Sequence, residues 1–203
     1  MYKGSGPRIF PIIVAIVVIA IVIAALFSVG RMIFLDGGSS ESTGDSAEQT
    51  INLQEEVLKT NASREVRYTV RGPIVAEENF RSYQITVGPS SRSMITYSGY
   101  LDEVLENRTF GNNTRAYEEF VHALDKASIS NTREAKDEDI RGVCATQGRA
   151  YTFETLNSGK PTYTIWTSTC GGSKGSMAAN VSQIHALFSN QIPDFKPVFD
   201  SVQ

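Results

Sequence analysis

Hydrophobic and polar positions divide the chain into three stretches. Residues 9–30 are almost wholly apolar, and no charged side chain interrupts Ile9–Val29. At 1.5 Å per residue, a helix over this stretch is about 31 Å long, close to the roughly 30 Å hydrocarbon core of a bilayer. The pattern therefore predicts a transmembrane helix over 9–30, with 1–8 as a short segment before it.

Two other interpretations of this segment stay open. A cleaved signal peptide normally has an apolar region of about 7–15 residues and then a small-residue cleavage site, whereas this run is longer and no such site is clear. A pilin-like assembly helix would carry a glutamate near the start of the apolar run, and none is present. The pattern therefore favours a retained signal anchor.

Basic residues indicate how this anchor is oriented. Lys3 and Arg8 precede the apolar run, whereas Arg31 and then Asp36 follow it. Because positive charge is retained on the cytoplasmic side of membranes, residues 1–8 are expected in the cytoplasm and the C-terminal domain outside it.

The next stretch, 31–63, is expected to be a flexible spacer. Its segment 37–50, "GGSSESTGDSAEQT", is rich in Gly, Ser, Thr and acidic residues, which is typical of a solvated linker. Leu53, Val57 and Leu58 fit the spacing of one short helix that begins after Asn52.

Residues 64–203 are expected to fold as one extracytoplasmic α+β domain. Alternating apolar positions predict a strand around Val66–Val70, a hairpin over Tyr83–Tyr100 and a second hairpin over 151–168. Helical spacing predicts a helix over Arg115–Ala127. A second amphipathic helix, ending before Pro193, is marked by Met177, Val181, Ile184, Leu187 and Phe188. The order favours a two-layer fold, an antiparallel sheet with both helices on one face.

Charge narrows the class of partner. The chain has 22 acidic and 19 basic residues, and apart from Lys3 and Arg8 the basic residues number 17, which leaves a net charge of −5. This acidic balance argues against nucleic acid as the main partner. His122 and His185 fall on predicted helices without ligand spacing, so no metal or cofactor is expected.

Two cysteines, Cys144 and Cys170, are expected to form a disulfide. If the second hairpin pairs Leu156 with Pro161, Cys170 lies opposite Gln147, three residues from Cys144. The bridge would close a loop of about 27 residues and stabilise the fold by roughly 3 kcal/mol. An even number of cysteines fits an oxidising compartment, although buried free thiols or a reactive cysteine remain alternatives.

A G-x-S-x-G pattern, Gly171–Gly175 with Ser173 at its centre, lies between a predicted strand and a predicted helix. Such a context is typical of a nucleophile elbow. Against this, the only histidine after Ser173 is His185, which precedes the acids Asp194 and Asp200. The favoured interpretation is a turn in which Ser173 or Ser176 caps the following helix, and no catalytic residue is predicted.

Three longer stretches resemble a known group of proteins. They are "GYLDEVLENRTFGNNTRAYEEFVHAL", "RGVCATQGRAYTFETL" and "WTSTCGGSKGSMAANVSQIHALFSNQIPDF". They look like uncharacterised membrane-anchored extracytoplasmic proteins of Saccharibacteria. More distantly, "YQITV" at 83–87 and "YSGY" at 97–100 resemble small bacterial lipoprotein domains of unknown function. The resemblance covers roughly residues 65–195 and implies placement and fold, but no catalytic residues.

The expected function is therefore binding by a single-pass, membrane-anchored extracytoplasmic protein. An envelope or surface protein is the expected partner, and Tyr100 and Trp166 are candidate contacts because exposed aromatic residues are frequent in interfaces. Two alternatives stay open. One is a small extracytoplasmic serine hydrolase that uses Ser173, and the other is a structural component of a filament or secretion assembly.

Overall fold

The computed structural model describes residues 52–135, 137, 139–144, 147–171 and 174–196. These residues belong to one compact unit, Gln49–Gln203. The predicted transmembrane segment 9–30 and spacer residues 31–51 lie outside the described residues. Within the described ranges, no helix is both long enough and apolar enough to cross a membrane.

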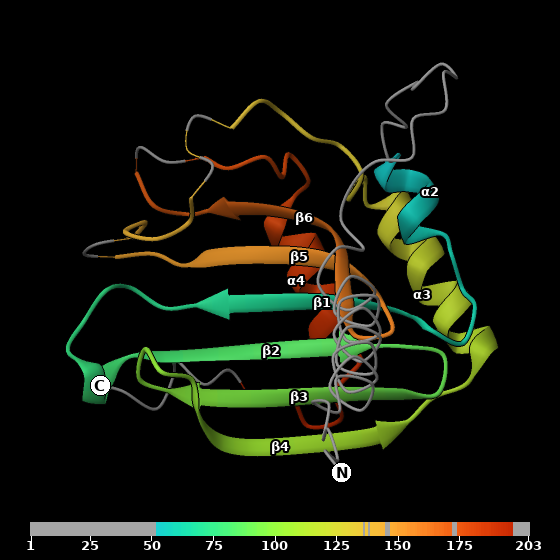
Figure 1. Ribbon diagram of the computed structural model, residues 1–203, viewed down its shortest axis with the longest axis horizontal. Helices are drawn as coiled ribbons and strands as arrows, with labels where there is room; N and C mark the ends of the chain where they lie inside the picture. Colours follow the sequence, from blue (N-terminus) through green and yellow to red (C-terminus); the bar gives the residue numbers. More distant parts are fainter. Residues whose placement is uncertain (1–51, 136, 138, 145–146, 172–173, 197–203) are drawn as a thin grey trace, which may run out of the picture. The chain divides into compact units, whose positions relative to one another are not determined.

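Six antiparallel strands form a single sheet in the order β4-β3-β2-β1-β5-β6, as Figure 1 shows. β1 lies at the centre, where it pairs with β2 of one predicted hairpin and with β5 of the other. This confirms the α+β class and the antiparallel sheet. The strands span Arg64–Arg71 (β1), Arg81–Val87 (β2), Ser91–Ser98 (β3), Glu103–Gly111 (β4), Ala150–Asn157 (β5) and Lys160–Ser168 (β6).

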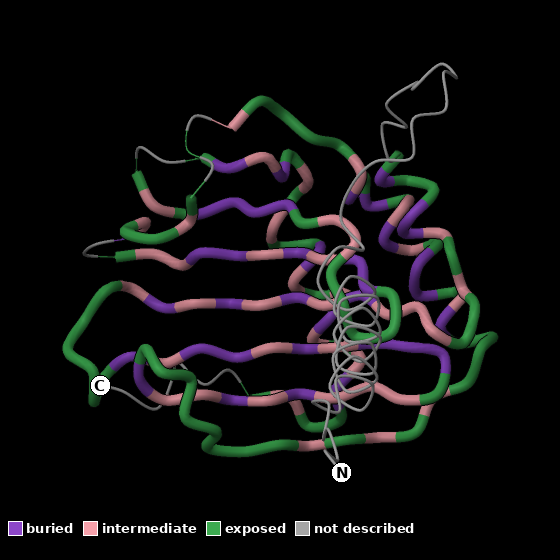
Figure 2. The backbone as a smooth tube through the Cα atoms, in the orientation of Figure 1, coloured by how far each residue is buried: buried purple, intermediate pink, exposed green. Residues whose placement is uncertain are grey.

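Strand β4 is absent from the sequence prediction. Its residues are exposed along almost the whole strand, because it lies at the edge of the sheet (Figure 2). Without a buried face, the strand shows no alternation of apolar and polar residues, which is the pattern that reveals a half-buried strand. The first predicted hairpin therefore continues through the turn at Gly99, where φ is +68°, into a third strand.

Each α-helix in the described ranges begins after an asparagine. α2 (Leu53–Val57), α3 (Thr114–Lys126) and α4 (Val181–Ser189) follow Asn52, Asn113 and Asn180, whose side chains accept hydrogen bonds from first-turn backbone N–H groups. The predicted serine cap of the last helix is therefore wrong. Ser176 lies before the helix, and its hydroxyl accepts a hydrogen bond from the Trp166 backbone N–H at 3.4 Å. A short 3-10 turn, η1, spans Glu77–Asn79.

The core lies on one face of the sheet and combines aliphatic side chains with a cluster of aromatic rings. Alternate side chains of the central strands are buried, as the colouring in Figure 2 shows. Phe188 of α4 stacks on Tyr68 of β1 with ring centroids 4.9 Å apart, and Phe120 of α3 meets Phe188 edge-on at 5.1 Å. Phe188 therefore joins both longer helices to the same face of the sheet.

The short helix expected near residue 53 forms and packs into the core. Leu53 and Val57 are buried within the apolar cluster. Between them, the buried Glu56 carboxylate binds Lys59, Arg64 and Thr162, with Arg64 Nη1 2.6 Å and Thr162 Oγ1 3.1 Å from its Oε2. The folded unit therefore extends to the N-terminal side of Arg64.

Glu56 is expected to make stability depend on acid pH. Burial alone would raise the pKa of this carboxyl, but hydrogen bonds from Lys59 and Thr162 and the charge of Arg64 outweigh burial and hold the pKa below 4.5. A lowered pKa in the folded state stabilises the fold above pH 4.5, and this contribution is lost as the pH falls through the folded-state pKa.

We expect Glu56→Gln to lower the free energy of unfolding by about 1–3 kcal/mol at pH 7 and to flatten the acid limb of the stability curve. Urea unfolding of the full-length chain between pH 3 and 7 checks this. The matched control is Glu55→Gln on the exposed neighbour, which should follow the native curve. An acid limb unchanged in Glu56→Gln would show that another group is responsible.

Candidate partner-binding site

The predicted disulfide is present. Cys144 and Cys170 are bonded, with their Cα atoms 5.2 Å apart and 26 positions apart in the sequence. The predicted register beside it is wrong by one residue, because a β-bulge between Thr155 and Leu156 shifts the pairing of β5 with β6. Gly148, rather than Gln147, therefore lies beside Cys170. Gly148 has φ +92°, and a Cβ there would lie 2.9 Å from the Cys170 sulfur.

The disulfide positions a loop at one end of the sheet. The Cys144 carbonyl accepts a hydrogen bond from the Ile74 backbone N–H at 3.0 Å. This bond joins residues 139–144 to the connection between β1 and β2. Cys170, at the other end of the bridge, follows β6. The β1–β2 connection, residues 139–144 and the segment after β6 are therefore held together at the end of the sheet where β1 ends.

The glycine loop does not form the context that a nucleophile elbow requires. β6 ends at Ser168, whereas α4 begins only at Val181. Ser173 lies outside the described residues. Gly175 has a packing role, because a Cβ at this position would collide with the indole ring and the carbonyl oxygen of Trp166. The second glycine of the pattern is thus explained by its close approach to Trp166.

His185, the histidine considered for catalysis, belongs to the core face. Its Nδ1 lies 3.4 Å from the Tyr83 hydroxyl, and its ring lies near Tyr68 and Phe195. Burial, together with the positive charge of Arg149, lowers the pKa of His185 below its ordinary value. The neutral imidazole is therefore favoured, as expected for a ring packed among aromatic side chains.

The two candidate contact residues occupy different environments. Trp166 is only 6% exposed and packs against Gly175, so it offers little area to a partner. Tyr100 is 37% exposed. Its ring stacks on Phe80 at a centroid distance of 4.1 Å, and its hydroxyl donates to the Val75 carbonyl at 2.7 Å and accepts from the Val75 N–H at 3.0 Å. Tyr100 is thus an exposed aromatic ring held in a fixed position.

Several exposed apolar side chains lie at the same end of the sheet as Tyr100. Among the described residues, the large apolar side chains that remain exposed lie in the β1–β2 connection, in the β3–β4 turn and at the start of β4, on the left in Figures 1 and 2. We call this group the tip surface. It comprises Ile74, Val75, Tyr100, Leu101, Val104 and Leu105. Sequence reasoning missed all but Tyr100, because only the folded chain brings these segments together.

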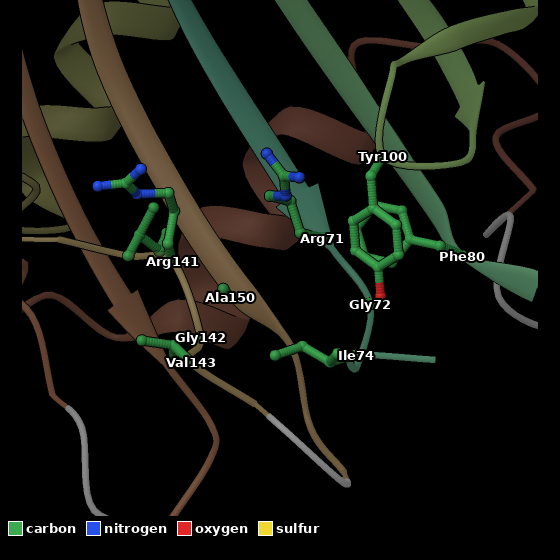
Figure 3. A pocket seen from close by; sticks show the side chains of 10 residues that line it. Arg71, Gly72, Ile74, Phe80, Tyr100, Arg141, Gly142, Val143 and Ala150 are labelled. Carbon is green, nitrogen blue, oxygen red and sulfur yellow. The ribbon is translucent and has the colours of Figure 1, made fainter. Parts of the chain in front are cut away.

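A pocket of about 190 Å³ adjoins the tip surface. Figure 3 shows Arg71 and Ala150 between two walls, one made by Phe80 and Tyr100 and the other by Arg141–Val143. Ile74 belongs to both the pocket and the tip surface. On the other side of the 139–141 segment, a second hollow of about 420 Å³ is lined by Asp139, Ile140, Arg141, Thr152, Thr164 and Trp166.

The site offers cationic and apolar groups rather than a metal centre. Within the part of the chain that the structure describes, no three His, Cys, Asp or Glu side chains come together in a way that could hold a metal ion. The chain matches no protein-family model, and no curated protein matches it. The geometry of the tip surface and its pocket is therefore the basis for a functional proposal.

Proposed function

We propose that this chain is a single-pass membrane-anchored extracytoplasmic protein whose disulfide-stapled α+β domain binds a partner protein through the tip surface. The observation that carries the proposal is that the large exposed apolar side chains of the described residues lie at one end of the sheet, together with a fixed tyrosine. Contiguous exposed apolar groups are costly in water, and on soluble domains they commonly mark interaction sites. Leu101 is the most exposed of them, at 92%.

The tip surface is also arranged as interfaces usually are. Glu77 accepts a hydrogen bond from the Tyr100 backbone N–H at 3.0 Å, so an acidic side chain lies at the margin of the apolar group. Asp102 and Glu103, both exposed, follow Leu101 and place acidic groups beside it. An apolar centre with a polar rim is typical of protein–protein interfaces. Because Tyr100 is already immobilised, its burial by a partner would cost little additional side-chain entropy.

Placement outside the cytoplasm is supported by three observations. The apolar run 9–30 has the length of a membrane span, and Lys3 and Arg8 precede it. The domain carries a disulfide, a bond that persists in oxidising compartments. The resemblance to membrane-anchored extracytoplasmic proteins points to the same location.

Site-specific photo-crosslinking in cells that produce the full-length chain tests the proposal. A photoreactive residue at Leu101 should give a discrete adduct with a partner protein. The control is Lys160, the first residue of β6, which is exposed at the opposite end of the sheet. It should give no such adduct.

Two results would contradict a specific partner at the tip surface, namely no adduct from Leu101, or the same adducts from both positions. An adduct of twice the mass of the chain would instead indicate self-association, as a structural assembly protein requires. The serine hydrolase alternative receives no support from the strand and helix positions around the glycine loop.

A further inference from the structure

The pocket beside the tip surface contains an arginine that is set apart from the other basic side chains of its strand. β1 also carries Arg64, which binds Glu56, and Arg67, whose Nε lies 2.6 Å from Glu154 Oε2. Arg71 is the last residue of β1 and lies on the same face of the sheet as Arg67. Among the described residues, no carboxylate lies within ion-pair distance of Arg71.

Aromatic packing holds this arginine in the pocket. Its Cζ lies 5.3 Å from the centroid of the Phe80 ring, a cation–π contact, and Phe80 is in turn covered by Tyr100. The contact restrains the guanidinium, and none of the carboxylates that the structure describes neutralises its N–H donors. A planar guanidinium with available donors matches a carboxylate, which it can bind through two parallel hydrogen bonds.

The remaining walls of the pocket are mainly apolar, and its volume is small. Ile74, Val143 and Ala150 contribute aliphatic groups, and Tyr100 contributes a ring face. The volume of about 190 Å³ is well below the roughly 300–1,000 Å³ of sites that enclose a drug-sized molecule. The pocket therefore has room for a group the size of one amino-acid residue.

A peptide C-terminus combines the two features that this pocket complements. Its last residue carries the free carboxylate and the side chain on one Cα, so both groups enter together. The pocket is also restrained before binding, because Gly72 N–H donates to the Arg81 carbonyl at 3.1 Å and Ile74 N–H donates to the Cys144 carbonyl at 3.0 Å. Restraint of this kind lowers the entropic cost of binding.

We propose that this pocket binds the C-terminal carboxylate of a partner polypeptide that ends in an aliphatic residue, with Arg71 as the carboxylate ligand. The inference rests on the proposed function, since it identifies which part of the partner the tip surface receives. Ile74, which lies in both the pocket and the tip surface, would then contact both the terminal residue and the chain that leads to it.

Two small ligands test the pocket directly. N-acetyl-leucine carries the carboxylate and the aliphatic side chain, whereas N-acetyl-leucinamide differs in lacking the negative charge. Titration of the full-length chain, methyl-labelled at isoleucine and valine, should give saturable shifts at Ile74 and Val143 with the acid below about 50 mM. The amide should shift these methyl groups at least tenfold less at the same concentration.

The variants identify the residue responsible. Arg71→Gln should weaken binding of the acid at least tenfold. Arg71→Lys should weaken it less, because lysine keeps the positive charge but cannot donate two parallel hydrogen bonds from one planar group. Arg115→Gln, on the exposed surface of α3, is the control and should bind as the native chain does. The unchanged methyl spectrum of each variant away from the pocket confirms that it folds.

Three results would overturn the inference: no saturable shift with the native chain, equal binding of acid and amide, or undiminished binding by Arg71→Gln. The proposed function is judged separately by photo-crosslinking. A partner adduct from Leu101 that persists in Arg71→Gln, together with failure of the small-ligand titration, would leave the tip surface in place and remove only the role of the pocket.

Discussion

Removal of the disulfide is expected to cost about 3 kcal/mol of folding free energy. The pair Cys144→Ser and Cys170→Ser, introduced together, opens a loop of 26 positions and so increases the conformational freedom of the unfolded chain. In the folded state, the change also frees the segment whose Cys144 carbonyl binds Ile74. We expect the stability loss to be global and an increase in mobility to be confined to one end of the sheet.

Urea unfolding of the full-length native chain and of the double variant measures this loss. Reduction of the native chain should lower its stability by the same amount, whereas reductant should leave the double variant unchanged, which provides an internal control. A loss of less than about 1 kcal/mol would contradict the role assigned to the bridge. Amide exchange should then show faster opening at Ile74 than at Val66, which is buried at the other end of β1.

Gly175→Ala is the second substitution with a large expected effect. The added methyl group would collide with the indole ring and the carbonyl oxygen of Trp166. Neither the ring nor the carbonyl oxygen can move away freely, because the ring is buried and the oxygen accepts a hydrogen bond from the Met177 N–H at 2.9 Å. Overpacking of this kind costs about 1–3 kcal/mol, and here we expect the upper part of that range.

Gly171→Ala is the matched control within the same glycine pattern. No described atom lies within 4 Å of the Cβ that it would add, so its stability should remain close to that of the native chain. Trp166 is the only tryptophan in the sequence, and its fluorescence reports directly on the packing beside Gly175. Equal destabilisation by the two substitutions would show that the glycines act through backbone freedom rather than through the contact with Trp166.

Periodic patterns predicted the elements that have one buried face. Val66, Tyr68 and Val70 alternate along β1, and α3 places Phe120, Val121 and Leu124 in the core. β4 has no buried face and was missed. The start of α4 was placed too early because Met177 is buried and fits the helical spacing, yet it forms an isolated bridge with Thr132 before the helix.

The candidate site was less accessible to sequence reasoning than the fold. The hairpin register and an even cysteine count were enough to predict the Cys144–Cys170 pair, although the bulge at Thr162 of β6 moved the residue opposite Cys170 by one position. Trp166 and Tyr100 are both aromatic residues of predicted hairpins, and the sequence does not show which ring is exposed. Only the fold distinguishes the buried ring of Trp166 from the exposed ring of Tyr100. Arg71 differs from the other two arginines of β1 in having no carboxylate partner among the described residues, and this too is a tertiary property.

The claim that the folded domain lies outside the cytoplasm can be tested with single reporter cysteines in the full-length chain. Ser5→Cys reports on the N-terminal segment, and Glu119→Cys reports on the exposed face of α3, where the native side chain is 72% exposed. The native disulfide stays intact in both variants. A membrane-impermeant maleimide applied to intact cells should label Glu119→Cys and not Ser5→Cys, while both should react after lysis. Labelling of Ser5→Cys alone, or of neither variant before lysis, would contradict the proposed location.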